Sequence, residues 1–241
     1  MEKPREDTPI DAYREHAAFT IAGVAADPDV AGLEKGLAKE HHALKKQTRA
    51  LEDMEEEIQK KKAVLMIKDR CCDEVVRAFE LRLLGLVNKK RGDPQYRRYF
   101  PDGLREVTEA EPRKVEPALV KDIITALEED EGKPGIGPLA TEFKPQFQAA
   151  VGDVKSADKD LSATETEARH LRDKTIPGIK SAWGDEYVKL HGALRGKLPR
   201  DPARVEAFFY PFKKERKKPV EDGGGGAPEG GGAPGGGEQP G

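Results

Sequence analysis

Cysteine is nearly absent from this chain of 241 residues, and the two that occur, Cys71 and Cys72, are neighbours. Adjacent cysteines provide no disulfide framework and at most half of a zinc site, which excludes a small domain held together by disulfides. The pattern predicts a buried, reduced thiol in a reducing compartment. A redox switch and a metal-binding role are the alternatives.

Long hydrophobic runs are also missing. No stretch approaches the roughly 20 apolar residues that a membrane-spanning helix needs. The first 16 residues carry charges of both signs, and the apolar run that follows, 17–26, is too short and too late for a secretory leader. We therefore expect a cytoplasmic protein without a transmembrane segment, with leaderless export as the alternative.

Glycine and proline are absent between Gly36 and Gly85, and good helix formers dominate that stretch. An apolar residue recurs there every seven positions, which keeps one stripe of a slightly underwound helix facing a partner. Together these signals predict one long helix from about residue 33 to 89. The stripe is the expected interaction seam, and after Val30 it consists of Leu37, Leu44, Leu51, Ile58, Leu65, Cys72, Phe79 and Leu86.

The positions beside this seam are polar from about Glu40 to Lys62 and apolar again near Val75 and Leu83. A seam that widens in this way is typical of a coiled-coil stalk that broadens into a small bundle. The charge blocks 52–57 and 60–62 lie beside the narrow part. We interpret them as a solvated face with ion pairs along the helix, and a docking patch is the alternative.

Shorter amphipathic segments follow the long helix. The spacing of apolar residues predicts helices over about 115–127, 139–174 and 179–198, with a break or kink at residues 176–178, Ile-Pro-Gly. From Asp222 the chain is rich in Gly and Pro with almost nothing to bury, which predicts a disordered tail. The expected fold class is all-α, an elongated antiparallel helical bundle or coiled-coil hairpin with one long helix.

We divide the chain into a partly helical N-terminal segment (1–29), a helical bundle with a coiled-coil stalk (30–212), and a basic run with the tail (213–241). Two turns of the bundle have similar sequences, FPDGLREV at 100–107 and LPRDPARV at 198–205. This thin match suggests duplicated halves, 30–107 and 139–205. Chance similarity of two turns between helices is the alternative.

Catalytic and nucleotide-binding motifs are missing as well. The chain has no Gly-x-Ser-x-Gly turn, no cysteine with an arranged base and no phosphate-binding Gly-x-x-x-x-Gly-Lys loop. Glu167 and His170 have the Glu-x-x-His spacing of di-iron bundles, but such sites need a second copy of the motif, and none occurs. We expect no enzyme activity, no cofactor and no metal site.

The formal net charge is only −3, so any attraction to nucleic acid or membrane must come from local patches. Segments 89–100 and 195–218 mix cations with aromatic rings. Such mixtures can neutralise phosphates and stack on bases, or lie at a lipid headgroup layer. Alternatively, the rings cap the bundle while the cations stay solvated. The candidate contacts with an anionic partner are Lys89, Lys90, Arg91, Arg97, Arg98, Lys213, Lys214, Arg216, Lys217 and Lys218.

These features predict a non-enzymatic structural or adaptor protein that associates through its long amphipathic helices. The expected partner is a protein, most simply a second copy of the chain in a homo-oligomer. The second hypothesis is a binding module for nucleic acid or an anionic membrane surface, which acts through the two basic-aromatic segments.

Overall fold

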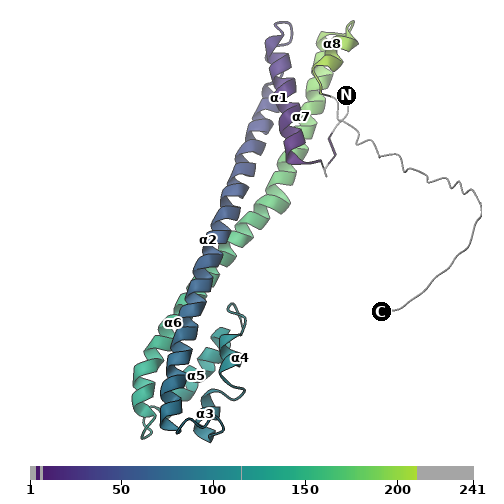
Figure 1. Ribbon diagram of the computed structural model, residues 1–241. Helices are drawn as coiled ribbons and strands as arrows, with labels where there is room; N and C mark the ends of the chain where they lie inside the picture. Colours follow the sequence, from purple (N-terminus) through teal and green to yellow (C-terminus); the bar gives the residue numbers. More distant parts are fainter. Residues whose placement is uncertain (1–3, 6–7, 115, 211–241) are drawn as a thin grey trace, which may run out of the picture. The chain divides into compact units, whose positions relative to one another are not determined.

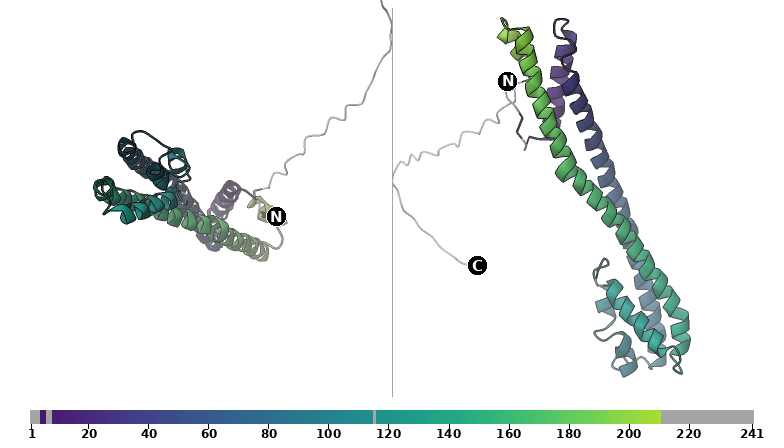
Figure 2. Two further views of the ribbon diagram at one scale, coloured as in Figure 1. Left: turned by 90° about the horizontal axis from the view of Figure 1, so that it is seen from below. Right: turned by 180° about the vertical axis from the view of Figure 1, so that it is seen from behind.

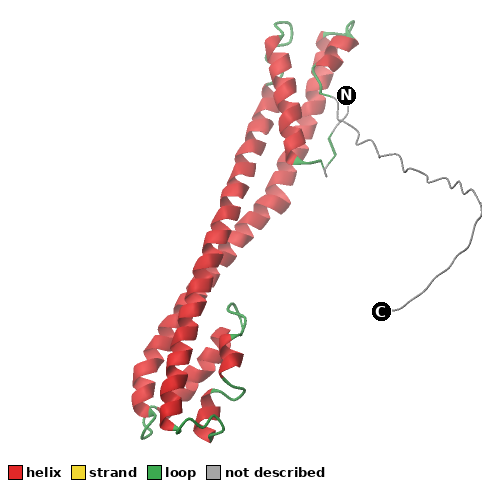
Figure 3. Cartoon of the chain, viewed as in Figure 1, coloured by secondary structure: helices red, strands yellow, loops and turns green. Residues whose placement is uncertain are grey.

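The computed structural model describes residues 4–5, 8–114 and 116–210. All regular structure in this part of the chain is helical (Figure 3). The predicted all-α fold class is thereby confirmed. The basic run 213–218 and the Gly/Pro-rich tail lie outside the described residues.

The helical elements follow one another along the chain with short connections. In order they are α1 (Ile10–Ala26), α2 (Lys35–Leu86), α3 (Pro94–Tyr99), α4 (Leu104–Thr108), α5 (Glu116–Asp130), α6 (Gly137–His170), the π-helical turn η1 (Leu171–Thr175), α7 (Ile176–Lys197) and α8 (Pro202–Ala207).

The longest helix, α2, has 52 residues and therefore a length of about 78 Å at about 1.5 Å per residue. It begins and ends within a few residues of the limits predicted from its sequence. Asn88 and Lys89 end it by adopting positive φ angles of 52° and 62°. The amide of Lys89 donates a hydrogen bond of 2.7 Å to the carbonyl oxygen of Leu84. This left-handed turn caps the last turn of the helix and redirects the chain.

A second long helical path, from Gly137 to Lys197, lies alongside α2 in the opposite direction (Figures 1 and 2). α6 packs on the second half of α2, and α7 packs on the first half. The path does not break at residues 176–178, which form the first turn of α7 and directly follow the π-helical turn η1. Pro177 has no N–H group to bond the carbonyl oxygen of Asp173. The wider π-helical turn before it lets the helix continue without that hydrogen bond.

Buried side chains form one hydrophobic core around the second half of α2, which packs with α3, α4, α5 and α6. Phe79 lies at its centre with 0% of its surface exposed. Its ring contacts four others, those of Tyr99, Phe100, Phe143 and Phe147, at centroid distances from 5.2 to 6.0 Å. This aromatic cluster holds the short helix α3 against the long helices α2 and α6.

A second core surrounds the first half of α2 and includes α1, α7 and α8. Trp183 stacks on Tyr187 at 4.7 Å and meets Tyr13 of α1 edge-on at 4.9 Å. α1 therefore packs into this core together with the long helices. Arg204 on α8 adds hydrogen bonds to Asp27 at the end of α1.

Between the two cores the packing is thin. Leu51 and Ile58 of α2 are only half-buried, and η1 beside them buries no side chain. The sequence predicted this region, because the positions flanking the seam are polar there. α2 thus connects two packed ends through a lightly covered middle.

Candidate anion-binding site

The predicted interaction seam of α2 faces other helices of the same chain. Its members are buried or half-buried except at the last position: Leu37, Leu44, Leu65, Cys72 and Phe79 are buried, Leu51 and Ile58 are half-buried, and Leu86 is 43% exposed. The buried members belong to the two hydrophobic cores. Most of the seam is therefore occupied within the chain, and the site most open to a partner lies elsewhere.

The first basic segment folds as a turn and a short helix beside the first core. Lys89 and Lys90 are exposed in the turn that ends α2. α3 then begins at Pro94, and the carboxylate of Asp93 accepts a hydrogen bond of 2.9 Å from the amide of Gln95. Aspartate at the N-cap and proline in the first turn are strong helix-start signals. They fix where the cations of α3 project.

An open cavity of about 460 Å³ lies beside this segment. It is lined by Arg91, Tyr96, Arg97, Phe100, Pro101, Asp102, Gly103, Leu104 and Arg105. Gly103 has a φ of 99°, and this turn brings Arg105 of α4 to the cavity that Arg97 of α3 also lines. The charged residues that line it are three arginines and one carboxylate, Asp102, so the lining carries a net positive charge.

Glu80 of α2 positions one wall of the cavity. This carboxylate is 6% exposed, and its Oε1 accepts hydrogen bonds from the Tyr96 hydroxyl at 2.8 Å and from Arg91 Nε at 3.2 Å. Burial, together with the Glu80 carboxylate, raises the pKa of Tyr96 to about 12. The charge of Glu80 also raises the pKa of Arg91. Arg91 is therefore held in place by an internal partner.

Arg97 and Arg105 form fewer or weaker contacts within the chain than Arg91 does. Arg97 is exposed, and within the described part of the chain it forms no ion pair. Arg105 has an 88% exposed side chain and lies 3.7 Å from Glu109, the residue directly after α4. An exposed pair at that distance contributes little. Both guanidinium groups can therefore bind an external anion.

Asp102 is the carboxylate that lines the cavity. Desolvation, and after it the charge of Asp102, raises the pKa of neighbouring Glu106. The two carboxylates therefore lie close enough to repel each other. A bound anion must be held by the arginines strongly enough to overcome Asp102.

Arg98 belongs to the same segment but faces α5. Its Nε donates a hydrogen bond of 2.9 Å to Asp130, which also accepts hydrogen bonds from the Tyr99 hydroxyl at 2.7 Å and from Lys133 at 2.6 Å. Burial would raise the pKa of Asp130, but the bonds from Lys133 and Tyr99 and the charge of Arg98 outweigh it and lower that pKa. Arg98 thus fixes α3 on α5 and does not line the cavity.

The aromatic rings of the segment are part of the core. Tyr96 and Tyr99 are 2% exposed, and Phe100 is 1% exposed. These rings offer no face on which a base could stack. In the second basic-aromatic segment Phe208 and Phe209 are also buried, whereas Tyr210 is 39% exposed. The cavity can therefore recognise a partner by charge and hydrogen bonding.

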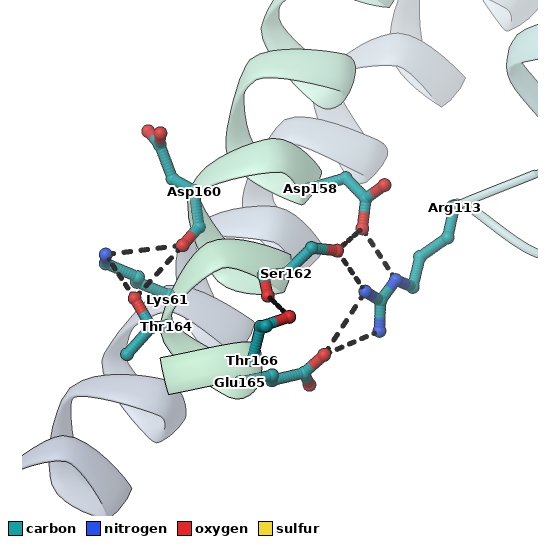
Figure 4. A network of polar contacts seen from close by, with 8 residues as sticks. All are labelled: Lys61, Arg113, Asp158, Asp160, Ser162, Thr164, Glu165 and Thr166. Carbon is teal, nitrogen blue, oxygen red and sulfur yellow. Dashed lines mark hydrogen bonds and ion pairs between the residues drawn. The ribbon is translucent and has the colours of Figure 1, made fainter. Parts of the chain in front are cut away.

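Outside the cavity, Arg113 is an arginine whose guanidinium group is bound by other side chains of the same chain (Figure 4). Its nitrogens donate hydrogen bonds to Asp158 at 2.6 Å, Ser162 at 2.7 Å and Glu165 at 3.3 Å, all on α6. The contact ties the segment before α5 to α6. Sequence reasoning missed it, because no local spacing links Arg113 to residues 45 to 52 positions further along the chain.

The residues considered for metal chemistry are dispersed. Glu167 and His170 lie exposed on α6, and in the described ranges no group of three or more His, Cys, Asp or Glu side chains is placed to hold a metal ion. Cys71 is exposed and Cys72 is buried. Burial, with the nearby Glu116, raises the pKa of the Cys72 thiol.

No protein-family model, curated protein or solved structure matches this chain. Across the residues that the structure describes, no helix combines the length and apolar character needed to cross a membrane.

Proposed function

We propose that this protein is a non-enzymatic adaptor that binds a phosphate-bearing partner through the arginine-lined cavity. The observation that carries the proposal is the pair of exposed guanidinium groups, Arg97 and Arg105, on one cavity. Guanidinium matches phosphate in geometry and charge and binds it through paired N–H donors. Arg91, positioned by Glu80, provides a third cation on the same wall.

The burial of Tyr96 and Phe100 bears on the class of partner. Nucleic-acid modules that hold single strands depend on exposed rings for stacking. A site of arginines over buried rings instead suits phosphate groups recognised by charge, as on a lipid headgroup or a phosphorylated protein. We therefore favour these partners over a base-reading role.

The length of the helices supports a role as a spacer. The exposed cysteine supports a cytoplasmic location. α2 and the path from α6 to α7 connect the cavity with the second core over about 78 Å of helix, at about 1.5 Å per residue. An exposed free thiol such as Cys71 persists most readily in a reducing compartment. A cytoplasmic location is part of the proposal on that ground.

The test is calorimetric titration of the full chain with inorganic pyrophosphate at low and at raised salt. Binding should weaken as salt increases. The double variant R97A/R105A should bind at least about tenfold more weakly, since it loses two charge-assisted contacts. The matched control, R195A, removes an exposed arginine of α7 and should bind as the wild type does. Equal binding by R97A/R105A and the wild type would refute the proposal.

Self-association through long helices stays a second candidate, supported by three exposed apolar residues of α2. Val64, Ile67 and Leu81 are 51%, 59% and 71% exposed. They are three and fourteen positions apart, which places them in one heptad register on the solvent side. Light scattering should report a dimer that I67E/L81E converts to a monomer. A monomeric wild-type protein at micromolar concentration would remove this candidate.

A further inference from the structure

We infer that the arginine-lined cavity takes a phosphorylated peptide segment in which a lysine or arginine flanks the phosphorylated residue. This inference rests on the proposed function, because it concerns the same cavity, and it adds a second charged group to the partner. The carboxylate of Asp102, which lines the cavity, is the feature that selects this group. Asp102 is thus a specificity-determining residue, whereas Arg97 and Arg105 bind the phosphate.

Charges of opposite sign line the cavity without neutralising each other. Asp102 is exposed and forms no ion pair with any residue that the structure describes. The carboxylates beside the lining arginines are different ones, because Arg91 binds Glu80 and Arg105 lies beside Glu109. The cavity therefore offers a place for an anion and a place for a cation at the same time. A ligand with negative charge alone uses the arginines and is repelled by Asp102.

A second carboxylate adds to the negative charge beside Asp102. Desolvation, and after it the charge of Asp102, raises the pKa of Glu106, so the two side chains repel each other. A cation brought to this place relieves the repulsion, because it attracts both carboxylates. The group that accompanies the phosphate is therefore an ammonium or a guanidinium.

The size of the cavity suits a short piece of chain. Its volume of about 460 Å³ lies within the range of about 300–1,000 Å³ in which proteins hold small ligands. It accommodates a few side chains of a partner and not a folded domain. In an extended peptide, alternate side chains point to the same side. A phosphorylated residue and a lysine two positions away can therefore enter together, with the phosphate toward the arginines and the ammonium toward Asp102.

The surroundings of the cavity favour a peptide over a lipid headgroup. Proteins that rest on a membrane place aromatic and other large apolar side chains at the lipid boundary. Residues 89–110 expose no large apolar side chain, and the rings of α3 and of Phe100 are at most 2% exposed. An anionic bilayer would also be repelled by Asp102 and Glu106.

The test measures, by calorimetry at low salt, the binding of the full chain to inorganic pyrophosphate and to two peptides that are blocked at both ends. One peptide is Lys-Ala-phosphoserine-Ala-Lys, and the other has alanine in place of both lysines. The wild type should bind the lysine peptide about threefold to tenfold more tightly, since the added contact is a charge pair near the surface. In D102N this preference should fall below about twofold. Pyrophosphate should bind D102N at least as tightly as the wild type, because a repelling charge is gone.

The matched control is D122N, which removes the same charge from an exposed position of α5 outside the cavity lining. It should keep the wild-type preference for the lysine peptide, and this separates the effect of Asp102 from that of net charge. R97A/R105A should bind pyrophosphate and both peptides more weakly, because it loses the groups that hold the phosphate.

The failure of this inference differs from the failure of the proposed function. Pyrophosphate binding without a preference between the peptides would overturn the inference and leave the proposed function in place, whereas no pyrophosphate binding would overturn both. A preference that persists in D102N, or weaker pyrophosphate binding by D102N, would contradict the role of Asp102. Phosphatidylethanolamine vesicles that displace pyrophosphate when the lysine peptide does not would overturn the inference in favour of a lipid headgroup.

Discussion

Replacing Glu116 with glutamine should remove a pH-dependent loss of stability from the fold. Glu116 is the first residue of α5, is 2% exposed and packs beside Cys72 of α2. Its Oε1 has no hydrogen-bond partner within the described residues. Burial, followed by the hydrogen bond and charge of Asp69, raises the pKa of Glu116 to about 8. The folded protein therefore holds this carboxyl group in its neutral form at physiological pH.

The magnitude follows from the difference between the folded and unfolded states. The folded state keeps the proton up to about pH 8, whereas the unfolded state releases it near the ordinary value of 4.5. Between these values unfolding releases a proton, so the free energy of unfolding falls by about 1.4 kcal/mol per pH unit. Over two pH units the ceiling is about 2.7 kcal/mol, and we expect about 1–2 kcal/mol after relaxation around the site.

The assay is urea unfolding followed by circular dichroism at about pH 5.5 and about pH 7.5. Glutamine keeps a donor for Asp69 and does not titrate, so E116Q should lose about 1–2 kcal/mol less stability than the wild type over this interval. The control E128Q changes an exposed glutamate on the same helix and should follow the wild type. An E116Q protein whose stability falls as steeply as the wild type would refute the reasoning.

Three further outcomes are expected. K89G should raise the free energy of unfolding in urea by about 0.5–1 kcal/mol, because glycine adopts the left-handed turn that ends α2 without strain; a loss of stability would contradict this. F79A should lower the free energy of unfolding by about 3–5 kcal/mol, because four rings lose their central contact; a loss below about 1 kcal/mol would mean that the first core is loosely packed. A thiol reagent should modify Cys71 alone in the native protein and both cysteines after denaturation, and two reactive native thiols would contradict the burial of Cys72.

The long helix could be predicted because its signals are local. Seven-residue spacing and the absence of Gly and Pro act on neighbouring turns, and α2 begins and ends within a few residues of the predicted limits. The contact of α1 with α7 could not be found in this way. Tyr13 and Trp183 are 170 positions apart, and no periodicity within either segment links them. Likewise, Pro177 predicts a disturbance of the helix, but only the packing decides that a π-helical turn accommodates it.

The sequence predicts which cations lie in the segment of the candidate site, but it does not predict which of them line the cavity. The sequence identifies the cations of segment 89–100, but their internal partners decide which of them are available. Arg98 is bound by Asp130, 32 positions further along the chain. Arg105 lies outside the predicted segment, and its one signal was the Pro-Asp-Gly turn at 101–103, which brings it to the same cavity as Arg97.

The most direct test of the central claim is an NMR titration of the arginine side-chain Nε–Hε resonances with inorganic pyrophosphate. If the cavity binds phosphate, the resonances of Arg97 and Arg105 should shift and saturate together. Those of Arg98 and Arg113, which are bound by internal carboxylates, should stay in place. Equal, non-saturating shifts of all exposed arginines, or no shift at Arg97 and Arg105, would contradict the account.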